Sequence, residues 1–199
     1  VKFDVMAIGE SAFSECKALT SVKIAEGITK IGSWAFYNSE NLVEVVIPST
    51  VKTISGRAFQ SCDNLEKVTL PEGIERIENY TFDNCYKLSE IKIPSTVKEI
   101  GSSAFYNCTS VKKLVIPQNV TFIECSAFGS LTLEELVVED GEKEIKIDLF
   151  PFDNTSAKTL YMGRPMSLTS WFKSNETQTL ILGPKLNKWY NSYTGTGVT

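Results

Sequence analysis

Six phenylalanines recur along this chain at a constant interval of 23 residues. They are Phe13, Phe36, Phe59, Phe82, Phe105 and Phe128. An interval of this length is typical of a chain in which one small structural unit is copied and stacked on its neighbours. It therefore predicts a repeat solenoid, in which equivalent residues of successive units lie next to one another.

Other positions keep the same register as the phenylalanines. An isoleucine stands five residues before each Phe, and an alanine directly before each except Phe82, which follows Thr81. The positions three residues after each of the first five phenylalanines hold small residues, namely Cys16, Ser39, Cys62, Cys85 and Cys108. One complete unit can be written LxxVxIPxxVxxIGxxAFxxC.

Two patterns of apolar residues coexist within the unit. The VxI segment alternates and is β-branched, which predicts a short strand with one buried face, and the proline that follows marks the strand's end. In AFxxC the apolar positions have the spacing of a one- to two-turn helix that buries one side. We therefore expect eight strands stacked in parallel on one face of the solenoid, with short helical turns on the other face.

The strict period loosens after Phe128. Three later segments still resemble ribbon strands, namely Leu136–Val138, Leu160–Met162 and Leu180–Leu182. The pairs Leu149-Phe150 and Trp171-Phe172 fall where the Ala-Phe pair belongs. We predict regular 23-residue repeats over residues 1–131, divergent repeats of the same solenoid over 132–186, and a C-terminal cap and tail over 187–199.

The chain begins partway through a repeat. Val1 occupies the position of Ile24, and Val5 that of Ile28. Neither an initiator methionine nor a signal peptide with a charged start and an apolar run precedes them. We therefore expect a monomeric segment of a longer protein.

Composition excludes several classes of function. A net charge of −4 with scattered basic residues argues against nucleic-acid binding, which needs a concentrated basic surface. No apolar run approaches the roughly 20 residues needed to cross a bilayer, so we expect no membrane insertion. The chain has no histidine and none of the common catalytic motifs, so we expect no enzyme activity, catalytic residue, cofactor or metal.

At this point the repeat unit resembles a known family. Residues 42–64 and 88–110 are similar, almost position by position, to the BspA-like, or Treponema pallidum-type, leucine-rich repeat. The resemblance implies a right-handed leucine-rich-repeat coil with a parallel β-ribbon. It also implies a secreted bacterial cell-surface protein with a role in adhesion or protein binding, and the family has no catalytic motif to carry over.

The cysteines share one position of the repeat. Stacked coils would place Cys62, Cys85 and Cys108 about 5 Å apart at Cα, within disulfide range. Their side chains would point the same way, however, which would strain a disulfide. We expect reduced, buried thiols that pack as small hydrophobic groups, with one strained disulfide as the alternative. Cys125 lies at a different, variable position.

Two sets of outward positions follow the predicted ribbon. The first set alternates in charge sign, namely Glu44, Lys67, Glu90, Lys113 and Glu135, and is either self-neutralising or a recognition strip. The second set becomes apolar in its C-terminal half, at Val115, Val137, Tyr161 and Ile181. These four residues, with Glu90 and Lys113 at their edge, are our candidate partner-binding site, unless a divergent loop covers them.

Aromatic residues on the other face form a rival candidate site. They are Trp34, Tyr37, Tyr80 and Tyr106, and they would either pack on neighbouring coils or stack on a ligand. We expect the chain to bind a protein, such as a host surface or matrix protein. The alternatives are a structural spacer within a larger surface protein and a glycan-binding module that uses the exposed aromatic residues.

Overall fold

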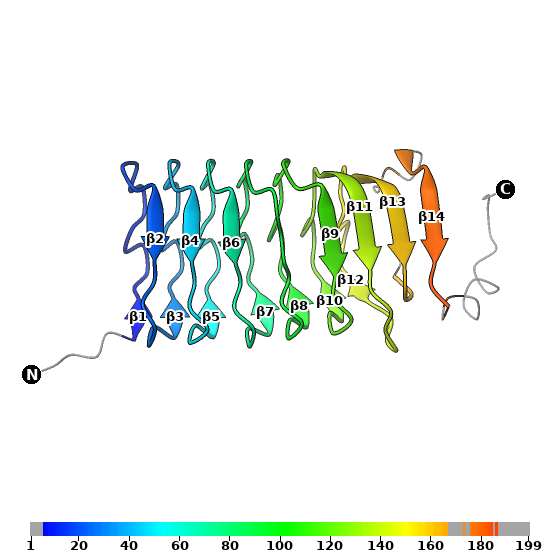
Figure 1. Ribbon diagram of the computed structural model, residues 1–199, viewed down its shortest axis with the longest axis horizontal. Helices are drawn as coiled ribbons and strands as arrows, with labels where there is room; N and C mark the ends of the chain where they lie inside the picture. Colours follow the sequence, from blue (N-terminus) through cyan, green and yellow to red (C-terminus); the bar gives the residue numbers. More distant parts are fainter. Residues whose placement is uncertain (1–5, 167–172, 174–175, 185, 187–199) are drawn as a thin grey trace, which may run out of the picture.

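The computed structural model describes residues 6–166, 173, 176–184 and 186. These residues form an elongated solenoid whose coils follow one another from the N-terminal to the C-terminal end (Figure 1). The predicted repeat solenoid with a parallel β-ribbon is confirmed.

The β-ribbon runs the length of one face. Its strands are β2 (Ser21–Lys23), β4 (Glu44–Val46), β6 (Lys67–Thr69), β9 (Lys113–Ile116), β11 (Thr132–Val138), β13 (Ser156–Met162) and β14 (Thr179–Leu182). They pair in parallel in the orders β2-β4-β6 and β9-β11-β13-β14. Of the eight predicted strands, the one near Ile91, between β6 and β9, is replaced by an isolated bridge between Lys67 and Glu90. The ribbon therefore divides into two sheets at this coil.

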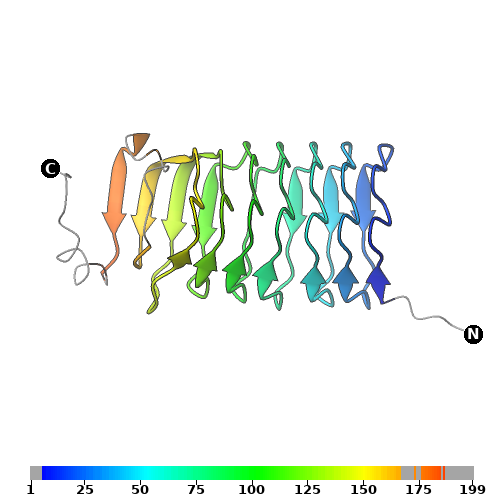
Figure 2. The same cartoon turned by 180° about the vertical axis from the view of Figure 1, so that it is seen from behind.

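A second ladder of two-residue strands lies on another side of the solenoid (Figure 2). Its members are β1 (Ala7–Ile8), β3 (Lys30–Ile31), β5 (Thr53–Ile54), β7 (Arg76–Ile77), β8 (Glu99–Ile100), β10 (Phe122–Ile123) and β12 (Lys146–Ile147). They form the parallel sheets β1-β3-β5 and β7-β8-β10-β12. Each strand ends on the recurring isoleucine, which points into the core, and the sequence analysis did not predict this ladder.

The predicted helical turns around each Phe are wrong, because the described chain forms β-turns there and no α-helix. Residues two before and two after the Phe have positive φ, for example 54° at both Trp34 and Asn38. Every second amide also bonds to the next coil rather than within its own: Phe36 N donates to Ala58 O at 2.8 Å, whereas Tyr37 N donates to Trp34 O of its own turn at 3.0 Å. Stacking thus satisfies the backbone groups that a helix would have paired internally.

The core is a continuous stack of phenylalanine rings. Neighbouring ring centroids lie 5.2–5.5 Å apart from Phe13 to Phe152. The prediction that Phe59, Phe82 and Phe105 share one buried stack is confirmed, since none of the three is exposed. Phe13 is 44% exposed because it lies at the end of the described stack.

The predicted position of the seventh ring is wrong by two residues. Phe152, rather than Phe150, stacks on Phe128, and Leu149 is 64% exposed. The carbonyl of Pro151 accepts the Phe128 amide, as the alanine carbonyl does in earlier coils. Pro151-Phe152 therefore takes the Ala-Phe position after an interval of 24 residues. The other predicted pair, Trp171-Phe172, lies outside the described residues.

The recurring cysteine position has a role beyond packing. Cys62, Cys85 and Cys108 are buried free thiols, and each Sγ lies 3.1–3.2 Å from the carbonyl of the Phe one coil earlier. Ser39 occupies the same position, and its hydroxyl donates to the Phe13 carbonyl at 2.9 Å. The position therefore selects a small side chain that can donate a hydrogen bond across the stack.

Candidate functional site

Four apolar side chains lie side by side on the C-terminal half of the ribbon. The parallel register pairs Val115 with Val137, Val137 with Tyr161, and Tyr161 with Ile181. Because side chains alternate along a strand, the flanking inward residues Leu136 and Val138 are buried in the core. We call Val115, Val137, Tyr161 and Ile181 the apolar ribbon patch.

The apolar ribbon patch is accessible to solvent. Val115, Val137 and Tyr161 are half-buried, while Ile181 is 45% exposed. Its strands β9, β11, β13 and β14 lie next to one another at one end of the ribbon (Figure 1). The structure thus brings the four predicted residues together on one surface, and their role in binding stays a prediction.

Tyr161 is held in place at the centre of the patch. Its hydroxyl lies 3.1 Å from both carboxylate oxygens of Asp140, which follows β11. A Cβ added at Gly183 would come within 3.1 Å of the same hydroxyl. Desolvation and the hydrogen bond to Asp140 raise the pKa of Tyr161. The patch therefore has an aromatic residue in a defined orientation, next to an exposed carboxylate.

A buried arginine supports the loop that carries Asp140. Arg164 Nη1 and Nη2 donate to the carbonyls of Gln118 and Pro117 at 2.7 and 2.6 Å. A side chain at Gly141 would collide with this arginine, because its Cβ would lie 2.7 Å from Arg164 Cδ. Desolvation lowers the pKa of Arg164, and the charge of Glu139 opposes this effect. Arg164 thus links two loops at the edge of the patch.

The charged positions beside the patch are only partly paired. Lys113 and Glu135 form an ion pair at 2.6 Å, and Lys158 and Glu134 form another at 2.8 Å. Among the other members of the strip, which all lie in the described region, Glu44, Lys67 and Glu90 form no ion pair. A direct ion pair therefore forms at the edge of the patch, where Lys113 meets Glu135, while the parallel register places Lys67 next to the opposite charges of Glu44 and Glu90 without direct contact.

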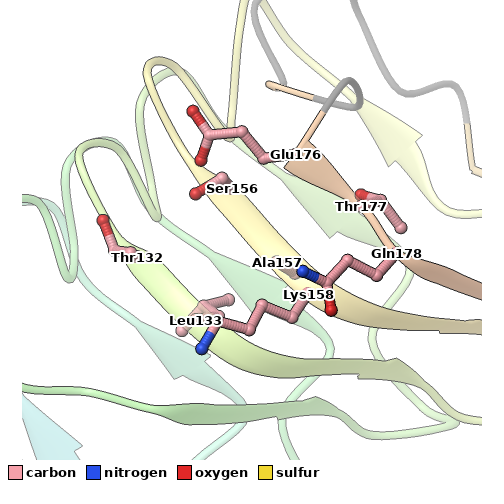
Figure 3. A pocket seen from close by; sticks show the side chains of 8 residues that line it. All are labelled: Thr132, Leu133, Ser156, Ala157, Lys158, Glu176, Thr177 and Gln178. Carbon is pink, nitrogen blue, oxygen red and sulfur yellow. The ribbon is translucent and has the colours of Figure 1, made fainter.

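A hollow of about 390 Å³ opens at the other end of the same strands (Figure 3). It is lined by Thr132 and Leu133 of β11, Ser156, Ala157 and Lys158 of β13, and Glu176, Thr177 and Gln178 before β14. Thr177 Oγ1 is buried there without a hydrogen-bond partner. Beside the hollow, Gln178 N donates to the Lys158 carbonyl at 2.9 Å, and Lys173 N donates to the Thr155 carbonyl at 2.8 Å.

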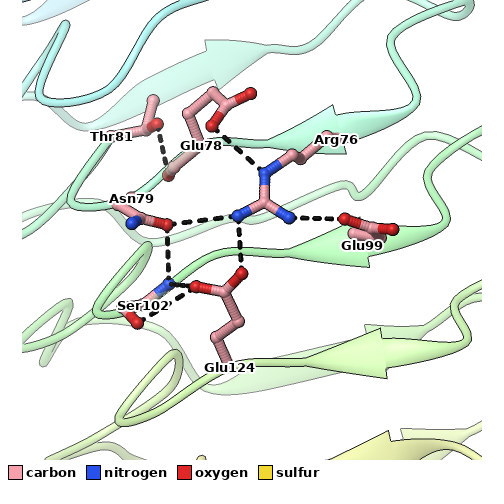
Figure 4. A network of polar contacts seen from close by, with 7 residues as sticks. All are labelled: Arg76, Glu78, Asn79, Thr81, Glu99, Ser102 and Glu124. Atoms are coloured by element: carbon pink, nitrogen blue, oxygen red, sulfur yellow. Dashed lines mark hydrogen bonds and ion pairs between the residues drawn. The ribbon is translucent and has the colours of Figure 1, made fainter.

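A polar network crosses the ladder of short strands (Figure 4). Arg76 on β7 forms ion pairs with Glu78, with Glu99 on β8, and with Glu124, which follows β10. Partial burial favours a higher pKa for Glu124, but the hydrogen bond and charge of Arg76 outweigh it and lower the pKa. The network joins three coils through a single guanidinium.

The rival aromatic residues are only partly available. Arg57 lies between two of them, with its Cζ 5.3 Å from the Trp34 ring centroid and 4.6 Å from that of Tyr80. Tyr37 and Tyr106 are half-buried, at the repeat position that lies three residues after that of Trp34 and Tyr80. The cation between Trp34 and Tyr80 was missed at the sequence level, although the spacing of Trp34, Arg57 and Tyr80 is 23 residues.

Other kinds of site find no support in the part of the chain that the structure describes. No cluster of three or more potential metal-ligating residues occurs within it. Within these same ranges, no helix has the length and apolar character needed to cross a membrane.

Comparison with known proteins identifies what the repeats resemble. Residues 2–77 and 35–158 match the profile of the BspA type leucine rich repeat region, with six copies. Curated proteins give no match.

Solved structures give the same result. A leucine-rich repeat protein from Bacteroides ovatus aligns with a TM-score of 0.70 and 26% identity, over 82% of this chain and 48% of its own. A leucine rich cell surface protein from Faecalibacterium prausnitzii aligns with a TM-score of 0.66 and 30% identity, over 77% of this chain and 43% of its own. The T. pallidum leucine rich repeat protein shares the fold, with a TM-score of 0.70 at 22% identity, over 98% of this chain and 79% of its own. This chain therefore spans less than half of the first two proteins.

Proposed function

The chain belongs to the BspA type leucine-rich repeat family, and from this premise we propose that it is a non-catalytic cell-surface module that binds another protein through the apolar ribbon patch. The family has a fold of the protein-interaction type. The relative from Faecalibacterium prausnitzii is a cell surface protein, which supports a surface location for this chain as well.

The observation that carries the proposal is the register of the four patch residues. Parallel pairing aligns Val115, Val137, Tyr161 and Ile181 across four adjacent strands, so their side chains form one continuous apolar surface. The inward residues of β9, β11 and β13 fill the core, so the outward residues of these three strands are free of that role, whereas every residue of β14 is exposed. Such a row on a soluble surface is typical of an interaction site.

The surroundings of the patch indicate the kind of partner. Lys113 and Lys158 are neutralised by Glu135 and Glu134, whereas Asp140 keeps an exposed carboxylate at the edge. A folded protein that presents an apolar side chain next to a basic one would complement both features. A host surface or matrix protein with such a surface is the partner that we propose.

Tyr161 is the residue that should contribute most to binding. Tyrosine is enriched among the residues that dominate interface energies, and such residues lie near the centre of the interface. The hydrogen bond to Asp140 orders its side chain before the partner arrives, which reduces the entropy lost on binding.

The proposal is tested by measuring the affinity of five variants for a panel of purified matrix proteins by surface plasmon resonance. Tyr161→Ala should weaken binding by roughly 30-fold, the loss expected for a central residue worth about 2 kcal/mol. Val137→Asp should weaken it at least as much, because it places a charge within the apolar surface. Both variants should melt close to the wild type, since these side chains point outward.

Val46→Asp is the matched control for Val137→Asp. Val46 occupies the same outward position on β4 and is 46% exposed, but it lies far from the patch along the ribbon. Its substitution should leave the affinity unchanged. If Trp34→Ala and Tyr37→Ala reduce the affinity while the patch variants do not, the turn face is the binding site. If no matrix protein, glycan or neighbouring domain binds, the chain is a structural spacer.

A further inference from the structure

A shallow polar groove of about 460 Å³ lies on the turn face, away from the apolar ribbon patch. This volume falls within the usual range for small-molecule sites. Tyr80 and Tyr106 line the groove together with Ser103 and Ser126. Each of these four residues is half-buried, as expected for the walls of an open groove.

The groove begins where a row of large side chains ends. Trp34, Arg57 and Tyr80 occupy the same position in successive coils, all with φ between 54° and 61°. The next two coils hold Ser103 and Ser126 at this position, with nearly the same φ of 52° and 53°. The backbone is thus unchanged, and only the loss of side-chain volume opens the groove.

The ring of Tyr106 lies along the groove, in space that is open because the next coil has a glycine, Gly129, beside it. A Cβ added at Gly129 would lie 2.6 and 2.8 Å from Tyr106 Cδ2 and Cε2, so the ring occupies the space that a side chain there would need. The same repeat position holds Asp83 in the coil before Tyr106 and Asp153 in the coil after Gly129, and both aspartates also line the groove. The site therefore contains a positioned aromatic ring between two carboxylates.

Oxygen acceptors predominate among the remaining polar groups. Asp83 is buried and accepts a hydrogen bond from Gln60 through Oδ2 alone, which leaves Oδ1 for another donor. Desolvation raises the pKa of Asp83, against the opposing effects of the Gln60 hydrogen bond and the Arg57 charge. Asn107 Nδ2 donates to Asn84 Oδ1 at 2.9 Å, so the Asn107 oxygen is free to accept from a ligand.

We propose that this groove binds one or two residues of a neutral oligosaccharide. A pyranose ring presents several hydroxyl donors to the acceptors of Asp83, Asn107 and Asp153, and an apolar C–H surface to the ring of Tyr106. The two carboxylates disfavour sialylated or sulfated sugars. The Arg57 charge beside Tyr80 disfavours a lysine or arginine ligand. Since no aliphatic side chain lines the groove, an apolar peptide residue would gain little there.

The test is a titration of the ¹⁵N-labelled protein with maltotriose, mannotriose and N-acetyllactosamine, followed by amide chemical shifts. At least one of these neutral sugars should shift the amides of Ser103, Asn107 and Ser126. Ser103→Tyr should abolish the effect, because it extends the row of Trp34, Arg57 and Tyr80 into the groove in a backbone conformation that accepts such side chains. Tyr106→Ala should weaken binding by about 10-fold.

Ser11→Tyr is the matched control. Ser11 has the same repeat position and a φ of 54°, but it lies in the first coil, so this variant should bind sugar like the wild type. Val137→Asp should also bind sugar normally, which separates this proposal from that for the apolar ribbon patch. The proposal is overturned if none of the three sugars shifts these amides, or if Ser103→Tyr binds as well as the wild type. It is equally overturned if an oligolysine peptide produces the shifts and the sugars do not.

Discussion

The thiol of Cys85 shows how a neighbouring coil determines the environment of a single residue. It is completely buried between the coils of Cys62 and Cys108, and its Sγ lies 3.2 Å from the Phe59 carbonyl. Burial raises its pKa well above the usual value, and burial also raises the pKa of Cys62 to about 12. A buried thiol of this kind is chemically inert. The spacing of the cysteines alone would also be compatible with a disulfide between neighbouring coils.

The reactivity of the thiols follows from this burial. At pH 8 a pKa of about 12 leaves only about one thiol in ten thousand ionised. Labelling with Ellman's reagent should therefore modify the half-exposed Cys16 and Cys125 first, and Cys62, Cys85 and Cys108 only on unfolding. Reductant should leave the melting temperature unchanged. A clear fall in melting temperature on reduction would show that a disulfide links these positions.

The phenylalanine stack should contribute a large part of the stability. Phe82 is fully buried between Phe59 and Phe105, so Phe82→Ala removes its apolar contacts and leaves a cavity, which should cost about 3–5 kcal/mol in the free energy of unfolding. Phe13→Ala is the control, because Phe13 is 44% exposed and stacks on Phe36 alone within the described region. Urea denaturation measures both. Equal losses for the two variants would contradict a stack whose interior rings are the most constrained.

At the scale of elements, the ion pairs of Arg76 link neighbouring strands of the short-strand ladder. The three carboxylates of Glu78, Glu99 and Glu124 converge on one guanidinium across β7, β8 and the end of β10 (Figure 4). Backbone pairing in this ladder is limited to two residues per strand. The ion pairs therefore add an interaction between coils where the strands themselves provide few.

Arg76→Ala should lower the free energy of unfolding by about 1–3 kcal/mol at pH 7, a value between those of exposed and buried pairs. The lowered pKa of Glu124 contributes stability that is complete above its unfolded-state value near 4.5 and is lost as the pH falls through the lower folded-state pKa. The difference between wild type and variant should therefore shrink below pH 4.5. Denaturation curves across this pH range measure it.

Lys98→Ala provides the comparison for Arg76→Ala. Lys98 forms an exposed ion pair with Glu75 at 2.9 Å, so its loss should cost at most about 0.5 kcal/mol. If the loss caused by Arg76→Ala does not change with pH, the network does not act through the charge of its glutamates.

The strands were predictable from the sequence and the turns were not. The ribbon strands other than β14 bury alternate residues more deeply than the residues between them, and this alternation leaves a direct pattern in the sequence, as at Val22 and Ile24. The left-handed turn positions hold Ser, Asn, Trp, Arg, Tyr, Glu or Phe instead of glycine, so no single residue type marks all of them. Every second amide of these turns donates to the next coil, which spacing within one repeat does not reveal, so the pattern favoured a helix incorrectly.

The same distinction applies to the candidate site. The relative positions of Val115, Val137, Tyr161 and Ile181 followed from strand spacing, because a parallel register aligns equivalent residues. Asp140 and Arg164, which support Tyr161 and its loop, could not be predicted, since they lie in loops without an equivalent in the regular repeats. The two-residue shift from Phe150 to Phe152 has the same origin, namely a longer interval at one divergent coil.

At the scale of the whole molecule, each coil contacts mainly its neighbours, so the solenoid presents long and rigid surfaces. The ribbon presents the apolar patch, and the turn face presents the polar groove between Tyr80 and Tyr106. The two surfaces differ in chemistry, which allows their ligands to be distinguished by substitution at one surface at a time.

The most direct test of the proposed interaction is oxidative footprinting of the protein alone and in complex with a bound matrix protein, read by mass spectrometry. If the apolar ribbon patch is the interface, oxidation of Tyr161 should fall markedly in the complex, while that of Trp34 and Tyr37 on the turn face should not change. Protection of Trp34 and Tyr37 with no change at Tyr161 would contradict the proposal.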